Sequence, residues 1–163
     1  MVYQKHPKKK IRDGSQYLIV ERNSRPVIQE AIIREGTPAD HAPASLLQVA
    51  AFGQVHWPFG EEPFKVAEID GSIVAYLVWR RTFTDEFEIL SLATHPDYQR
   101  KGLGRALIRE FCSAHQGDVF LEVRESNRGA IAFYQSLAFQ ETGVRHSYYG
   151  DTGEGAIVMK LHI

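Results

Sequence analysis

Two glycines and three basic side chains lie together at one short turn of the sequence, from Gln99 to Arg105. Glycine lets the backbone approach a ligand closely, and the first amides of a helix have no partners within that helix. The pattern after the turn predicts a helix that begins near Leu103, so its amides and its dipole would attract an anion. Arg100 and Lys101 add positive charge at the same turn. The stretch therefore predicts a site for a pyrophosphate group.

The glycine spacing alone does not identify the ligand. A dinucleotide site of the Rossmann type has a third glycine where this chain has Leu107, and a Walker loop has a Gly-Lys-Ser/Thr sequence that this turn lacks. From these residues alone, a basic turn whose glycines only permit tight packing is the alternative.

Three longer runs contain or follow this turn: His95–Leu107, Leu121–Asn127 and Ala130–Phe139. The first resembles the acetyl-CoA signature of the GNAT N-acetyltransferase superfamily, Gln/Arg-x-x-Gly-x-Gly/Ala, and the other two resemble the second signature of that superfamily. Together with Arg145–Tyr149 and Ala156–Met159, these runs are most similar to the bacterial ribosomal-protein-alanine N-acetyltransferases.

The resemblance to the superfamily covers roughly residues 28–163, and the closer resemblance is strong only from about Phe87 onward. It implies that acetyl-CoA is the co-substrate and acetyl donor. It also implies the residues that contact the coenzyme, which are Leu92, Ala93, Thr94, Gln99, Arg100, Lys101, Gly102, Leu103, Gly104, Arg105, Asn127, Ala130 and Phe133. Asn127 has an alternative role, because asparagine at this place also suits the N-cap of the helix predicted to follow.

Two carboxylates are candidates for the general base, which is needed because an ammonium of pKa about 8–10 is mostly protonated at neutral pH. Glu122 lies between Leu121 and Val123, where partial desolvation would raise the pKa of its carboxyl. The resemblance places the base of the alanine acetyltransferases here, whereas Glu88 falls where histone-type relatives have their glutamate. We favour Glu122, with Glu88 as a rival or a partner in a water relay. A strand-face carboxylate paired with an arginine or lysine is the simpler alternative for each.

Tyr134 is the candidate general acid. A phenol of pKa about 10 suits proton donation to a departing thiolate, and the resemblance places a tyrosine hydroxyl at the coenzyme sulfur. Its helical spacing from Ala130 also fits a simple core position. The resemblance further implies that a backbone amide around Leu92–Thr94 stabilises the oxyanion of the reaction.

Aromatic residues and one arginine are the candidates for the acceptor side. They are Trp57, Phe59, Arg145, Tyr148 and Tyr149. The segment Arg145–Tyr149 resembles the part of the alanine acetyltransferases that meets the incoming peptide terminus, and aromatic packing at sheet edges is the alternative. The seven histidines are scattered without zinc-like spacing, so we predict no metal ion.

The element pattern predicts an α/β (α+β) fold, a mixed, mostly antiparallel twisted sheet of about seven strands with helices on both faces. Strands are expected at Tyr17–Arg22, Val27–Arg34, Phe64–Ile69, Ile73–Arg80, Glu86–Ala93, Val119–Val123, Thr142–Tyr149 and Ala156–Leu161, and helices from Thr37 to about Phe52, from Leu103, and over Asn127–Leu137. Asp70-Gly71 is a strong signal for a hairpin turn. Ala138 departs from the family, which usually has glycine there, and alanine in a left-handed conformation costs about 1 kcal/mol.

Positive charge is concentrated at the N-terminal end of the 163-residue chain, whose net charge is −1. Residues 1–26 hold seven Lys or Arg and two Asp or Glu, a net of +5. We therefore divide the chain into a basic extension, 1–26, with a possible extra strand, and an acetyltransferase domain, 27–163. A solvated terminus is the common role of such an extension, so we expect no nucleic-acid partner.

The absence of an apolar run of 18 residues and the single cysteine, Cys112, predict no membrane partner and a cytoplasmic location. Both a monomer and a homodimer fit the sequence. The function that we predict is acetyl transfer from acetyl-CoA to a primary amine by direct attack. The favoured acceptor is a protein N-terminal amine, such as that of a ribosomal protein alanine. A small-molecule amine acetyltransferase and a non-catalytic acyl-CoA-binding module are the alternatives.

Overall fold

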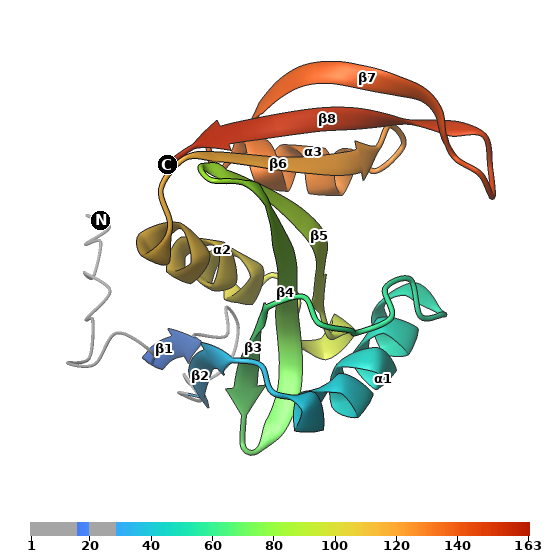
Figure 1. Cartoon of the computed structure of the whole chain (residues 1–163). Helices are drawn as coiled ribbons and strands as arrows, with labels where there is room; N and C mark the ends of the chain where they lie inside the picture. The colour runs from blue at the N-terminus through green and yellow to red at the C-terminus, as the bar shows by residue number, and fades with distance from the viewer. Residues whose placement is uncertain (1–15, 20–28) are drawn as a thin grey trace, which may run out of the picture.

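The computed structural model describes residues 16–19 and 29–163, and these form one sheet with helices packed on it (Figure 1). The strands are β1 (Gln16–Ile19), β2 (Gln29–Glu35), β3 (Phe64–Ile69), β4 (Ser72–Phe83), β5 (Glu86–Thr94), β6 (Asp118–Arg124), β7 (Gln140–Tyr149) and β8 (Glu154–His162). The helices are α1 (His41–Phe52), α2 (Leu103–Ala114) and α3 (Arg128–Gln135), with 3-10 turns at Pro38–Asp40 and Pro96–Tyr98. The strand order is β1-β2-β3-β4-β5-β6-β8-β7. Every pair is antiparallel except β5 with β6.

The predicted mixed, mostly antiparallel sheet is confirmed, and β1 makes it eight strands in the described residues. The rest of the predicted basic extension, 1–15 and 20–26, lies outside the described residues. Among the residues described, no helix is both long enough and apolar enough to span a membrane.

Helices cover both faces of the sheet, as the sequence predicts. The alternation of side chains along β4 produces two cores, because neighbouring residues of a strand point to opposite faces. Leu77 and Trp79 belong to the larger core under α2 and α3, whereas Tyr76 and Val78 belong to the smaller core under α1. In Figure 1, α1 and α2 accordingly lie on opposite sides of β4.

Two turns show how the sequence sets the backbone. Asp70 and Gly71 have φ angles of 49° and 77°, which is the left-handed pair that a two-residue hairpin requires, and the predicted turn between β3 and β4 is confirmed. Ala138, after α3, has φ of 70°, so the left-handed conformation that the family fills with glycine is retained with alanine. The neighbouring Phe139 is buried in the larger core, which holds this turn in place.

Strands β5 and β6 separate soon after they meet. They pair only from Glu86–Glu88 to Asp118–Phe120, whereas β5 continues beside β4 to Thr94 and β6 continues beside β8 to Arg124. In Figure 1 the two strands turn away from each other beyond the paired residues. The backbone of β5 between Ile89 and Thr94 thus lacks a strand partner on its β6 side, and this gap lies at the centre of the candidate site.

Candidate active site

The turn between β5 and α2 has the backbone of an anion site. Gly102 and Arg100 have φ angles of 90° and 63°, in the left-handed region. No side chain caps α2, and the amide of Ala106 donates to Gly102 O at 2.9 Å. The amides between these two residues therefore begin the helix without intrahelical acceptors. The side chain of Gln99 donates to Thr94 O at 3.3 Å and holds the turn against the end of β5.

A cavity of about 500 Å³ opens at this turn. Of the predicted coenzyme residues, it is lined by Leu92, Ala93, Thr94, Gln99, Arg100, Gly102, Leu103, Gly104, Arg105, Asn127, Ala130 and Phe133. Lys101 is not among the lining residues, and its ammonium lies 5.0 Å from the ring centroid of Tyr98. Ala51 and Phe52, at the end of α1, also line the cavity, although no sequence pattern indicates this role.

The walls of this cavity are held together by polar contacts between α2 and α3. Arg105 donates from its two terminal nitrogens to the backbone oxygen and the hydroxyl of Ser136, at 3.2 and 2.7 Å. Asn127 Oδ1 accepts from the amide of Ala130 at 3.0 Å, so its N-cap role is present in the structure. A Cβ on Gly104 would lie 3.4 Å from the ring of Phe133, which leaves little room for a larger residue.

A second cavity, of about 300 Å³, lies on the other face of the sheet. Glu88 and Glu122 both reach it, because they alternate along β5 and β6 with the core residues Phe87, Ile89 and Leu121. Its lining is Arg80, Thr82, Phe83, Glu86, Glu88, Phe120, Glu122, Arg145, Tyr148 and Val158.

The two carboxylates that the sequence leaves as rivals lie beside each other. Arg80 Nε donates to Glu88 Oε2 at 2.7 Å, and Arg145 Nε lies 3.2 Å from Glu122 Oε1. Burial raises the pKa of Glu122 above its ordinary value, and the charge of Glu88 raises that pKa further, against the opposing effect of Arg145. A carboxyl with a raised pKa is better suited to accept a proton near neutral pH than an ordinary glutamate is.

Tyr134 lies on α3 and lines the larger cavity. Its side chain packs edge-on against Phe133 and Phe139, with centroid distances of 5.1 and 5.5 Å. Burial raises the pKa of its hydroxyl, and the neighbouring Tyr149 adds to the effect. Tyr134 is therefore both part of the core and in contact with the cavity.

The structure divides the predicted acceptor residues into two groups. Arg145 and Tyr148 line the second cavity, and Tyr149 lies against Tyr148 at a centroid distance of 5.1 Å. Trp57 and Phe59 line neither cavity but pack on the smaller core under α1. The alternative of aromatic packing fits these two residues.

A buried glutamine that sequence reasoning missed fixes the segment that carries Trp57. Gln48, on α1, donates to Trp57 O at 2.7 Å and accepts from the amides of His56 and Trp57 at 2.9 and 2.7 Å. Its fully buried position follows Leu47 in the helix, so a glutamine within an apolar run is the signal that could have identified it.

The part of the chain that the structure describes gathers no group of three His, Cys, Asp or Glu side chains that could hold a metal ion.

Comparison with known proteins gives a match to the acetyltransferase (GNAT) family over residues 31–139. The chain is 40% identical over 100 residues to the ribosomal protein bS18-alanine N-acetyltransferase of Escherichia coli strain K12, with 58% of this chain and 67% of the relative covered. It is 42% identical over 81 residues to the N-alpha-acetyltransferase RimI of Mycobacterium tuberculosis, of which it covers 51%.

The fold has a close structural counterpart. The crystal structure of the ribosomal-protein-S18-alanine N-acetyltransferase from Escherichia coli superposes with a TM-score of 0.71 at 31% identity, and covers 82% of this chain and 94% of that one. The family match over residues 31–139 includes the turn at Gly102 and the strands that carry the two carboxylates.

Proposed function

The chain belongs to the acetyltransferase (GNAT) family, and we propose that it transfers the acetyl group of acetyl-CoA to the α-amine of a protein N-terminus. The observation that carries this proposal is the pair of cavities that share β5 as a wall, the larger one beside the part of β5 that has separated from β6. One has an anion-binding turn and the other has two adjacent carboxylates. A donor and an acceptor can thus approach the same gap from different sides.

The larger cavity is the proposed place of acetyl-CoA. The uncapped amides at the start of α2 suit the pyrophosphate, and Arg100 lines the cavity beside them. Glycine at position 104 keeps open the space next to Phe133. Acetyl-CoA supplies a thioester, whose acetyl carbon is open to attack by an amine.

Glu122 is the proposed general base, acting directly or through a water. It accepts a proton from the ammonium of the acceptor and leaves a neutral amine. Its raised pKa supports this role. The guanidinium of Arg145 lies beside this carboxylate, and the ammonium of the acceptor can take the place of that guanidinium. Glu88 is the proposed partner in this step, because it lies in the same cavity, bound to Arg80, and raises the pKa of Glu122.

Tyr134 is the proposed general acid, and the backbone of β5 is the proposed oxyanion site. Tyr134 lines the cavity that we assign to the coenzyme, and its hydroxyl would protonate the departing thiolate there. Leu92, Ala93 and Thr94 line the same cavity, on the part of β5 that has no partner on its β6 side, so an amide of this segment can face the ligand. Such amides stabilise a developing negative charge without any side chain.

The acceptor class is supported by the relatives, whose names give alanine of ribosomal protein bS18 and N-alpha-amines as targets. Arg145 and Tyr148, with Tyr149 beside them, are the proposed acceptor contacts. We also propose a cytoplasmic location, which the free cysteine Cys112 supports because free thiols are usual in reducing compartments.

The test combines purified full-length protein and acetyl-CoA with three sets of acceptors. These are peptides with a free N-terminus, the same peptides with a blocked N-terminus and one free lysine, and small amines. Thiol release gives the rate, and mass spectrometry locates the acetyl group. We expect acetylation of the free N-terminus, and Glu122→Gln should lower kcat by about 100-fold or more while acetyl-CoA binding persists.

The other outcomes of this experiment would support one of the two alternative functions. Turnover only with small amines would replace the proposed acceptor by a small-molecule amine. Tight binding of acetyl-CoA without turnover on any acceptor would identify a non-catalytic binding module.

A further inference from the structure

The end of the β7–β8 hairpin is not held by the sheet alone. Regular pairing of the two strands reaches Arg145 with Ala156, shifts register, and resumes only at Tyr149 with Glu154. Ser147, within the shifted segment, has φ of 51°. Tyr148 lies in this irregular segment of an edge strand and yet lines the second cavity. Contacts outside the ladder must therefore hold it in place.

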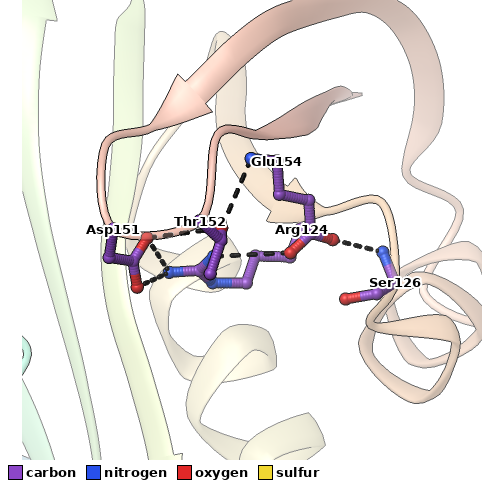
Figure 2. Close-up of polar contacts among 5 residues, drawn as sticks. All are labelled: Arg124, Ser126, Asp151, Thr152 and Glu154. Atoms are coloured by element: carbon purple, nitrogen blue, oxygen red, sulfur yellow. Dashed lines mark hydrogen bonds and ion pairs between the residues drawn. The ribbon is translucent and has the colours of Figure 1, made fainter.

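Arg124, at the end of β6, makes those contacts (Figure 2). One terminal nitrogen donates to both oxygens of Asp151, at 2.9 and 2.7 Å. The other donates to the Thr152 hydroxyl at 2.9 Å and to Glu154 at 3.4 Å. A single guanidinium thus binds three residues of the hairpin end, with one terminal nitrogen on the Asp151 carboxylate and the other on Thr152 and Glu154, and these charge-assisted bonds fix its orientation.

The same side chain connects this hairpin end to the aromatic residues and to α3. Arg124 Cζ lies 3.8 Å from the ring centroid of Tyr149, a stacked contact, and Tyr149 in turn packs edge-on against Tyr148. Glu154 also accepts from the amide of Ser126 at 2.6 Å, in the connection that leads into α3 (Figure 2). Arg124 lies two residues after Glu122 on the same face of β6, so the tyrosines are placed relative to that carboxylate.

We propose that Arg124 is a positioning residue, which fixes Tyr148 and Tyr149 at the acceptor cavity through Asp151, Thr152 and Glu154. The acceptor part of this proposal rests on the proposed function. A lysine keeps the positive charge at this position but has neither the planar fork nor the flat face that stacks on Tyr149. Arg124→Lys therefore tests the geometry of the guanidinium separately from its charge, which a neutral substitution would not do.

The kinetic test compares Arg124→Lys and Asp151→Asn with wild type, and uses Arg109→Lys on the exposed surface of α2 as the matched control. We expect Arg124→Lys to raise the KM of the peptide roughly tenfold, because a displaced positioning group weakens the productive complex. The kcat and the Kd of acetyl-CoA should stay within about twofold of wild type, as should all three constants of the control. An unchanged peptide KM, or a parallel loss in all three constants, would overturn the proposal.

A second measurement does not depend on turnover. Protein labelled with 3-fluorotyrosine gives a ¹⁹F resonance for each tyrosine, and Tyr148→Phe and Tyr149→Phe assign the two that matter. Arg124→Lys should shift or broaden these two resonances and leave that of the core residue Tyr76 in place. If both resonances keep their positions, Arg124 does not position the tyrosines. If they move but wild-type protein acetylates no peptide, the proposed function fails and the acceptor part of this proposal falls with it.

Discussion

At the scale of single residues, the cations around the two glutamates distinguish their roles. Glu88 has a direct bond from Arg80 at 2.7 Å, whereas the contact between Glu122 and Arg145 is longer, at 3.2 Å. A close cation keeps a carboxylate ionised, and an ionised neighbour makes the next carboxylate harder to ionise. The longer contact of Glu122, together with the raised pKa of its carboxyl, favours Glu122 as the residue that exchanges a proton.

Substitution of Glu88 by glutamine should therefore change the pH dependence of the reaction. The variant loses a negative charge and releases Arg80, and both changes lower the pKa of Glu122. A base works only when it is unprotonated, so the acidic limb of the kcat profile should move to lower pH. A profile at saturating acetyl-CoA and a ¹³C NMR titration of the Glu122 carboxyl provide the two measurements.

Glu61→Gln on the exposed loop is the matched control, and it should leave the limb where it is. If the acidic limb of the kcat profile stays in place in Glu88→Gln, or moves to higher pH, then Glu88 does not raise the pKa of the general base.

Tyr134→Phe separates the chemical role of this tyrosine from its packing role. The ring contacts with Phe133 and Phe139 remain in the variant, and only the hydroxyl is lost. We expect kcat to fall by about 100-fold, within the range for loss of a general acid, with an unchanged midpoint of thermal unfolding. Isothermal calorimetry should give the same Kd for acetyl-CoA. A kcat close to that of wild type would remove Tyr134 as the acid and leave it a core residue.

At the scale of elements, the turn after α3 carries measurable strain. Ala138 has φ of 70°, whereas glycine populates this region freely. Ala138→Gly should raise the free energy of unfolding by about 1 kcal/mol, because the left-handed conformation of alanine is relieved. Denaturant titration measures the change.

Ala132→Gly supplies the control within the same helix. Ala132 is exposed inside α3, where glycine costs about 1 kcal/mol relative to alanine. The two variants carry the same substitution and should have effects of opposite sign. A loss of stability in both would mean that the turn at Ala138 tolerates alanine without strain.

The elements also show which features of the fold and the site could be predicted from the sequence. Local signals predicted the hairpin at Asp70-Gly71 and the start of α2 at Leu103, and both are present in the structure, because each depends on residues adjacent in the chain. The other residues around Glu122 in the second cavity could not be predicted in this way. Arg80 reaches the cavity from β4, and Val158 faces it from β8, so their places depend on strand register and on the separation of β5 from β6.

The positions of Trp57 and Phe59, which line neither cavity, also depend on contacts that are distant in sequence. Trp57 and Phe59 occur in a loop, and composition alone does not tell which side of the loop faces the protein. Their position is decided by Gln48, whose side chain binds the loop backbone on the α1 face. A buried side-chain amide without hydrogen-bond partners is energetically costly. The loop backbone therefore stays where it can bond to the Gln48 side chain.

At the scale of the whole molecule, the separation of β5 from β6 puts the site between the two halves of the sheet. The lining of the larger cavity includes residues of β5, α2 and α3. The second cavity is lined by residues of the five strands β4, β5, β6, β7 and β8. A ligand in the larger cavity contacts elements that are far apart in sequence. It binds the folded protein and not the unfolded chain, so it must stabilise the whole domain.

Acetyl-CoA at a free concentration of 100 times its Kd should raise the free energy of unfolding by about 2.7 kcal/mol. For a chain of 163 residues this corresponds to a rise in the unfolding midpoint of roughly 5–10 °C. Gly104→Val should abolish the rise, because a Cβ at position 104 would already be in contact with Phe133 at 3.4 Å, and two further methyl groups would occupy space in the lining of the cavity. Each protein is compared with its own ligand-free form in scanning calorimetry, so any effect of the substitution on intrinsic stability cancels. An equal rise in Gly104→Val would mean that acetyl-CoA binds somewhere other than the turn at Gly102.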